Sequence, residues 1–269
     1  MHLAERVSQR VLEMRSNLEG LDPASLDPDE RIRQLAHKMV ARAFDLASLW
    51  KQADATDVVA QAVAVLDEAA VPIIRDPSEV AAIEQSLGWA QAGHTGQFRA
   101  DGKTPYIVHP ILATVLFLEV AHALNLDHAD VITTARIILM HDIHEKSRDF
   151  NWARMMIEDV ARRSSDTFTV DMGIKAVTGE VDVTMMLVLP YIFIWVKLFD
   201  RFSNMTDVTG VPPDKYERIL GRKIAQVRPG GKLWPLIERL DAPLSPFFTH
   251  VFAIIEQEHG LLGFGRVLI

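Results

Sequence analysis

Histidine and aspartate residues that could bind a metal ion occur at three separated places in the chain. His109 precedes a proline, His141 and Asp142 are adjacent, and Asp200 follows a long apolar segment. Imidazole nitrogens and carboxylate oxygens are common ligands of divalent metals, and four protein ligands leave other positions open for water. The four side chains therefore predict a metal site suited to hydrolysis, since a bound cation makes water more acidic and neutralises phosphoryl charge.

Glu145 and a stripe of four polar residues have spacings that could bring them to this site. Glu145 lies four residues after His141 and would share its helix face if the helix continues that far. A second group forms one stripe at helical spacing on the apolar segment and comprises Lys197, Asp200, Arg201 and Asn204. Burying such a stripe without a ligand, partner or metal is costly. We therefore expect it to face the site.

The elements that must position these residues are predicted to be helices. Apolar residues recur at three- and four-residue spacings, and Ala, Leu, Glu, Arg and Met are abundant, which is typical of an all-α fold. The expected helices are residues 2–19, 30–51, 56–70, 78–92, 111–125, 129–144, 151–163, 183–205, 213–227, 232–240 and 245–259. Asp27 or Asp29 is expected to cap the second helix.

Two segments depart from the ordinary amphipathic pattern. Residues 93–110, GHTGQFRADGKTPYIVHP, are rich in glycine, proline and polar side chains and predict a loop with definite turns. Residues 183–196 are almost entirely apolar but number only 14, whereas a membrane span needs about 20. They predict a buried helix that bends at Pro190.

Composition limits the classes of function. The 28 Lys plus Arg against 36 Asp plus Glu give a net charge of −8, which argues against a broad basic face for duplex nucleic acid. The absence of cysteine excludes disulfides, thiolate ligands and a cysteine nucleophile. The first 20 residues lack the apolar region of a signal peptide, so a cytoplasmic location without membrane attachment is expected. We expect an N-terminal helical extension at 1–85 and a main domain at 86–269.

Three ordered motifs resemble a known family. The motifs are HTGQFRADGKTPYIVHP from His94, LMHDIHEK around His141, and VKLFDRFSNM around Asp200. Together they resemble the hydrolase domain of the RelA/SpoT family, whose members are HD-domain metal phosphohydrolases. The resemblance covers about residues 86–207. Several separated motifs in the same order make it far more specific than a lone His-Asp pair.

The resemblance implies an HD-domain helical bundle that binds manganese and removes the 3′-pyrophosphate from ppGpp or pppGpp. It implies that the metal ligands are His109, His141, Asp142 and Asp200 and that Glu145 activates the water. It also implies that Arg99 lies beside the guanine base and that Asn204 holds the nucleoside. From their charge, the candidates to bind phosphate are Arg99, Lys103, Lys197 and Arg201. Arg201, next to Asp200, could instead be a structural ion-pair donor. His94 is a candidate for contact with substrate or a metal ligand.

Lys146 stands where the family's hydrolases have an aspartate, and this departure leaves three functions open. An ammonium beside Glu145 would weaken that carboxylate as a base or would bind a phosphate. The chain is then a hydrolase of guanosine polyphosphate, an HD phosphohydrolase of another nucleotide such as a deoxynucleoside triphosphate or cyclic nucleotide, or a nucleotide sensor that has lost catalysis. Another divalent metal could replace manganese, and the N-terminal helices could contact a partner or mediate homo-oligomers.

Overall fold

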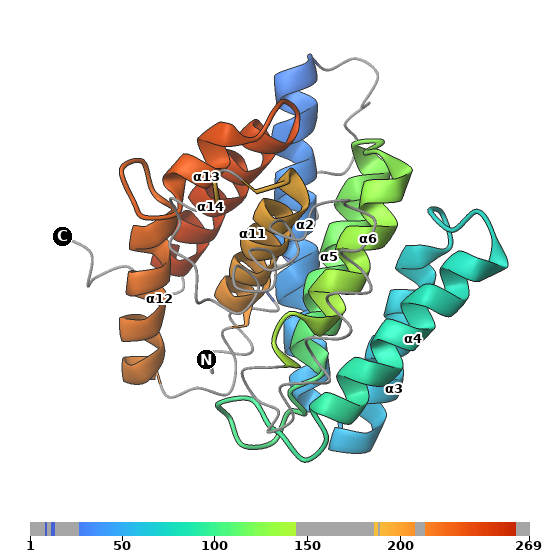
Figure 1. Cartoon of the computed structure of the whole chain (residues 1–269). Helices are drawn as coiled ribbons and strands as arrows, with labels where there is room; N and C mark the ends of the chain where they lie inside the picture. Colours follow the sequence, from blue (N-terminus) through green and yellow to red (C-terminus); the bar gives the residue numbers. More distant parts are fainter. Residues whose placement is uncertain are drawn as a thin grey trace. The chain divides into compact units, whose positions relative to one another are not determined.

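The helices and strands of the described part of the chain are all α-helices. The computed structural model describes residues 27–143, 189–207 and 213–261, together with residues 9, 12, 13, 186 and 187; for 213–217 and 261 it describes the backbone alone. These ranges contain nine α-helices and no strand, with one isolated β-bridge between Phe98 and Pro105 (Figure 1). The expected all-α fold is confirmed for this part. Backbone contacts divide the chain into two compact units.

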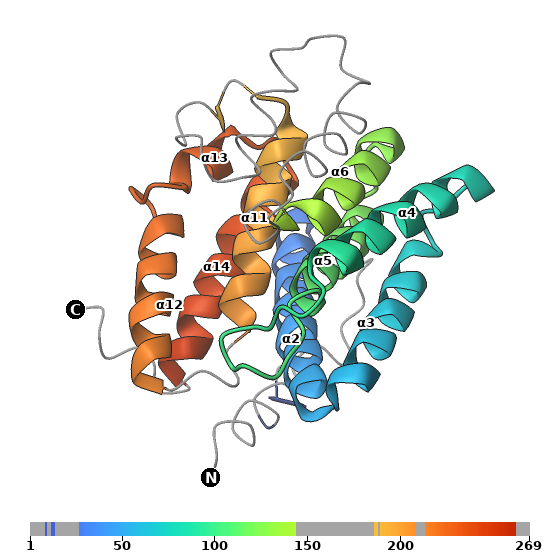
Figure 2. The ribbon, with the colours of Figure 1, turned by 60° about the horizontal axis from the view of Figure 1, so that its bottom comes forward.

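The unit Ala55–Asp200 holds every predicted metal ligand. Its helices are α3 (Ala55–Ala70), α4 (Pro77–Gly93), α5 (Val108–Ala123), α6 (His128–Met140) and the first part of α11 (Tyr191–Thr206). α5 and α6 run side by side, α3 packs on α5, and α4 packs on α6 (Figure 1). A short turn joins α3 to α4, and a longer loop leads from α4 to α5 (Figure 2). The glycine-rich segment thus forms the predicted loop.

α5 is the central helix of this unit because it is apolar on almost every side. Its residues from Val108 to Leu118 are all buried, as expected for a helix without a polar face. α11 packs on it through aromatic rings: the Phe117 ring lies 5.9 Å from Trp195 and 5.2 Å from Phe199, centroid to centroid. These contacts set the position of α11 along α5. Because Asp200 directly follows Phe199, they also set the position of Asp200.

Aspartate side chains cap the helix N-termini that the sequence marks. Asp27 accepts a hydrogen bond from the backbone N–H of Glu30 at 2.9 Å, so the first of the two expected capping residues is confirmed. Asp76 caps α4 and Asp127 caps α6 in the same way. Each cap satisfies a backbone donor that the helix itself leaves unpaired.

The other unit comprises Met1–Asp54 and Arg201–Ile269. Its described helices are α2 (Pro28–Gln52), the end of α11, α12 (Pro213–Val227), α13 (Trp234–Arg239) and α14 (Leu244–Leu261). α14 packs on α2, α12 and α13. A half-buried ion pair joins Lys51 Nζ to Asp207 Oδ1 at 2.5 Å. His259, on α14, donates from Nε2 to the carbonyl oxygen of Met205 at 2.8 Å and so holds the end of α11.

Two expected helices were wrong in their bounds. α6 ends at Met140 rather than at 144. Nδ1 of the His141 ring donates a hydrogen bond to the carbonyl oxygen of Ile138, which a further helical turn would otherwise pair with a backbone N–H. α11 does not bend at Pro190 but begins directly after it, since proline lacks the N–H that a helix interior requires. The expected helices at 2–19 and 151–163 lie outside the described residues, apart from residues 9, 12 and 13. The boundary at residue 85 stays a prediction. Among the described helices, none is long and apolar enough to cross a membrane.

The buried His259 makes stability depend on pH. Burial lowers the pKa of His259 from 6.5 to about 4. Between these pH values the unfolded chain binds a proton that the folded chain does not, so the free energy of unfolding must fall as the pH drops through this window. In His259→Gln, whose amide can still donate to Met205, we expect the loss between pH 7 and 4.5 to shrink by roughly 2 to 3 kcal/mol. Urea unfolding at both pH values measures it, and equal losses in the two proteins would contradict it.

Candidate metal centre

Three elements of one unit bring the four predicted ligands together. His109 comes from the first turn of α5, His141 and Asp142 follow the last residue of α6, and Asp200 lies on α11. All four side chains are buried, with exposed fractions between 3% and 9%. Buried titratable groups of this kind require compensation by a partner or a ligand.

The distances between the histidine nitrogens and the carboxylate oxygens are those of neighbouring ligands around a small metal ion. His109 Nε2 lies 3.5 Å from Asp142 Oδ2 and 3.3 Å from Asp200 Oδ1. His141 Nε2 lies 3.3 Å and 3.4 Å from the same two oxygens. Bonds of about 2.1 Å at ordinary coordination angles put neighbouring ligand atoms about 3.0 to 3.4 Å apart. His109, His141 and Asp142 form a buried group that could hold a metal ion. Asp200 lies outside that group of three, and its Oδ1 is 3.3 Å and 3.4 Å from the two histidine nitrogens.

The tautomer of His141 also suits a metal. Its Nδ1 lies 2.6 Å from the carbonyl oxygen of Ile138, which can only accept, so Nδ1 carries a hydrogen. The neutral ring then has its lone pair on Nε2, which faces the carboxylates. This nitrogen is buried and makes no well-aligned hydrogen bond within the described residues. A backbone carbonyl that fixes the tautomer in this way is the usual support of a metal-binding histidine.

The electrostatics of the cluster favour a cation. Burial opposes ionisation of Asp142 and Asp200, but the two histidines outweigh it and hold the pKa of each carboxyl below its usual range. Burial alone would lower the pKa of His141, but the two carboxylates raise it to about 9. For His109, burial and the nearby Arg99 lower the pKa to about 4. At neutral pH the carboxylates are therefore ionised, and the C-terminus of α6 adds partial negative charge.

Tyr106 belongs to the cluster and was missed in the sequence. Its hydroxyl donates to Asp142 Oδ2 at 2.8 Å. Burial and the charge of Asp142 raise the pKa of the phenol well above its usual range, so it remains a donor. In the sequence, the available signal for Tyr106 was its position three residues before His109. In the structure, the His109 N–H donates to the Tyr106 carbonyl oxygen. That spacing puts the two side chains at one end of α5.

Tyr106 also brings two predicted substrate residues close to the ligands. The buried His94 ring lies 4.9 Å from the Tyr106 ring, and its Nδ1 lies 3.1 Å from Gln97 Oε1. The guanidinium carbon of Arg99 lies 5.3 Å from the centroid of the Tyr106 ring. Lys103 is exposed on the same loop. His94 and Arg99 thus each contact Tyr106, which in turn contacts the predicted ligand Asp142.

Three of the remaining predicted site residues lie on α11, and two lie outside the described residues. Lys197 lies on α11 with its Nζ 3.8 Å from Asp200 Oδ2. Arg201 and Asn204 continue the same helix in the unit of α2 and α14, and both are half-buried. Glu145 and Lys146, predicted to act in catalysis, lie outside the described residues.

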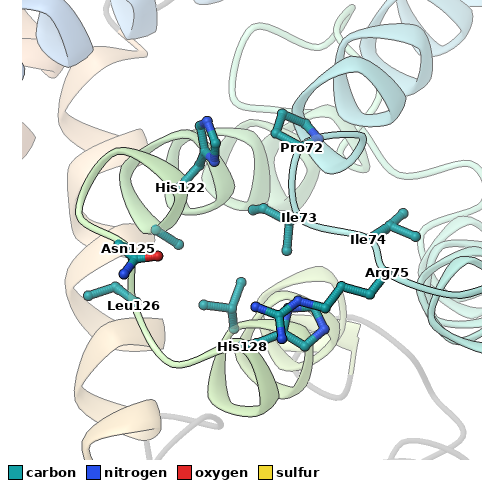
Figure 3. Close-up of a pocket in the computed structure, with 10 residues that line it drawn as sticks. Pro72, Ile73, Ile74, Arg75, His122, Asn125, Leu126 and His128 are labelled. Atoms are coloured by element: carbon teal, nitrogen blue, oxygen red, sulfur yellow. The ribbon is translucent and has the colours of Figure 1, made fainter.

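A separate pocket in this unit does not coincide with the cluster. Its volume is about 120 Å³, and it lies between the α3–α4 turn and the turn from α5 to α6. Arg75, His122, Asn125 and His128 surround it (Figure 3). It is roughly 20 Å along α5 from His109 by helix rise. His128 already pairs with Glu79 at 2.6 Å, and the pocket contains none of the predicted site residues.

Comparison with known proteins gives a distant similarity to one enzyme. No family model matches the chain. Over 153 residues the chain is 25% identical to a guanosine-3′,5′-bis(diphosphate) 3′-pyrophosphohydrolase from Borreliella burgdorferi. The match covers 54% of this chain and 22% of the relative, so it spans about a fifth of that protein's length. The helical fold of the described part and the buried His/Asp cluster are consistent with an HD domain.

The close packing beside Asp142 yields a prediction with an internal control. A Cβ on Gly93 would lie 2.7 Å from Cγ2 of Ile143, the residue after Asp142, whereas a Cβ on Gly88 would meet nothing within 4 Å. Gly93→Ala should therefore displace Ile143, lower the free energy of unfolding by about 1 to 3 kcal/mol and weaken metal binding. Gly88→Ala, in the interior of the same helix, should raise stability by about 0.5 to 1 kcal/mol.

Urea unfolding and manganese titration of both variants measure these effects. Equal stability and equal metal affinity in the two variants would show that Ile143 moves aside without disturbing Asp142.

Proposed function

We propose that the protein is a metal-dependent phosphohydrolase that removes the 3′-pyrophosphate from ppGpp and pppGpp. The observation that carries the proposal is the buried cluster of two histidines and two aspartates, in which each histidine Nε2 lies 3.3 to 3.5 Å from an oxygen of each aspartate. The distant similarity to a guanosine-3′,5′-bis(diphosphate) 3′-pyrophosphohydrolase supports the choice of substrate. A nucleotide is thus the proposed small-molecule partner.

The metal would be held by His109, His141, Asp142 and Asp200. Manganese is the proposed ion, and iron, zinc or another divalent ion suits the same donors. When bound, a divalent cation supplies charge that makes water more acidic and neutralises phosphoryl oxygens. The protein's own contribution is to keep both carboxylates ionised and to fix the His141 tautomer through the Ile138 carbonyl.

Glu145 is the proposed general base. It would take a proton from water as the water oxygen bonds to the phosphorus next to the 3′-oxygen. The bond from that phosphorus to the 3′-oxygen breaks, and the 3′-oxygen takes up a proton, which leaves GDP or GTP and pyrophosphate. Glu145 follows Asp142 by three residues, so the proposed base would be close in sequence to a proposed ligand.

Cations around the cluster are the proposed phosphate ligands. They are Arg99, Lys103, Lys197 and Arg201, and Asn204 would hold the nucleoside. Arg99 is the candidate for contact with the guanine base, since its guanidinium is already held over an aromatic ring. Arg201 Nε is buried and makes no hydrogen bond within the described residues, so a phosphate oxygen there would satisfy it. His94 would act on the substrate or through Tyr106.

Lys146 favours a second candidate. An ammonium next to Glu145 adds a phosphate-binding charge and weakens the neighbouring carboxylate as a base. A related activity on a deoxynucleoside triphosphate or a cyclic nucleotide, or nucleotide binding without turnover, would follow from that change. The first candidate and these alternatives use the same metal ligands, so the nucleotide consumed separates them.

Release of GDP and pyrophosphate from ppGpp, with manganese added, tests the proposal. We expect metal-dependent GDP formation, its loss in Glu145→Ala with metal binding kept, and loss of both metal binding and turnover in Asp200→Ala. Asp67→Ala, which changes an exposed aspartate of α3, is the matched control and should behave as the wild type. A panel of nucleoside triphosphates and cyclic nucleotides is assayed in parallel.

The outcomes of this assay are distinct. Consumption of another nucleotide but not ppGpp would move the activity to the second candidate. Tight nucleotide binding with no product would make the protein a sensor. Retained metal binding in Asp200→Ala would remove Asp200 from the ligand set.

A single substitution tests the departure at position 146. Lys146→Asp restores the acidic pair of the family motif and removes the charge that lowers the pKa of Glu145. We expect it to raise kcat for ppGpp by about tenfold, a change of about 1.4 kcal/mol in the barrier. Lys146→Ala is the control, because it removes the ammonium without adding a carboxylate. A fall in kcat/KM in both variants would instead assign Lys146 to phosphate binding.

A further inference from the structure

Tyr106 joins the loop before α5 to the turn after α6 through one hydrogen bond. Its hydroxyl donates to Asp142 Oδ2 at 2.8 Å, across 36 residues of sequence. The acceptor is the same oxygen that lies 3.3 Å from His141 Nε2 and 3.5 Å from His109 Nε2. Tyr106 therefore contacts the oxygen of Asp142 that lies near both histidines of the proposed ligand set.

We propose that Tyr106 is a positioning residue of the metal centre, which aims Asp142 Oδ2 at the ion and holds Arg99 beside it. The inference rests on the proposed metal binding. A carboxylate oxygen has two lone-pair directions, and a donor that takes one leaves the other for the metal. Hydrogen bonds of this kind, from a second layer of residues to a ligand, orient the ligand and typically change metal affinity by 10- to 100-fold.

Tyr106 can do this because its own position is fixed. Its backbone N–H bonds to the Gln97 carbonyl at 2.9 Å. Its ring packs against His94, with centroids 4.9 Å apart, and meets the His109 ring nearly edge-on at 5.9 Å. The hydroxyl that donates to Asp142 therefore stands on a fixed support, which an exposed side chain on a free loop would not provide.

The ring and the hydroxyl have separable roles. The Arg99 guanidinium lies over the ring, 5.3 Å from its centroid, whereas only the hydroxyl contacts Asp142. Tyr106→Phe removes the hydrogen bond and keeps the aromatic face for Arg99. Tyr106→Leu removes both. The two substitutions thus distinguish the support of the metal ligand from the support of the basic residue.

Manganese titration of the metal-free protein by calorimetry tests the inference without any substrate. We expect the Kd for manganese to rise 10- to 100-fold in Tyr106→Phe and to remain unchanged in Tyr191→Phe. Tyr191 is an exposed tyrosine on α11 of the same unit and serves as the matched control. Cobalt added in place of manganese should give a changed visible spectrum in Tyr106→Phe, because the geometry of the oxygen ligand changes. Tyr106→Leu should also raise the KM for ppGpp.

The result separates positioning from a purely structural role and from the proposed reaction. A structural hydroxyl would lower the thermal stability of the metal-free variant and leave the Kd for manganese unchanged, and that outcome overturns the inference. If the wild-type protein binds manganese but hydrolyses no ppGpp, the proposed reaction fails and the titration still decides the role of Tyr106. If the wild-type protein binds none of the three ions manganese, cobalt and zinc, the metal centre and the positioning role are both wrong.

Discussion

Two carboxylates and two imidazoles share one buried space, and their charge must be balanced there. Asp142 and Asp200 are ionised at neutral pH, and the C-terminus of α6 adds partial negative charge. Without a metal, a proton on His141 offsets part of this charge. A divalent cation held by His109, His141, Asp142 and Asp200, as proposed, would supply that positive charge instead. The geometry of the unit depends on this balance, because displacing one group leaves buried charge uncompensated.

The fold positions these charges by apolar packing as well as by the hydrogen bonds of Tyr106 and His141. α5 is buried on almost every side, and the rings of Trp195 and Phe199 lock α11 against Phe117. Asp200 follows this aromatic contact, and His109 begins the helix that makes it. On the other side, Gly93 lets α4 approach Ile143 without a Cβ between them. The side chains of the cluster therefore come from closely packed elements, which limits how far each proposed donor atom can move.

The sequence predicted what depends on local pattern and missed what depends on contacts between elements. Helical periodicity located most of the described helices, and residue chemistry identified His109, His141, Asp142 and Asp200 as one cluster. The end of α6 was wrong because the His141 ring, rather than a further helical turn, satisfies the Ile138 carbonyl. Tyr106 was missed because its partner lies 36 residues away. No spacing rule within a helix or a loop reports a hydrogen bond of that kind.

Charge balance also bears on how a polyphosphate could approach. The chain carries a net charge of −8, which repels an anion, but salt screens that repulsion beyond about 8 Å at physiological ionic strength. Attraction must then come from cations within a few ångströms of the cluster. Arg99, held over Tyr106, and Lys197, 3.8 Å from Asp200, are such cations in the described unit. Each is tied to a side chain that touches or forms the ligand set. A phosphate that pairs with Arg99 and Lys197 would reduce the positive charge these two residues offer to the carboxylates. A metal ion in the cluster would then stabilise the carboxylates more strongly, so we expect binding of a polyphosphate and of the metal to be mutually favourable.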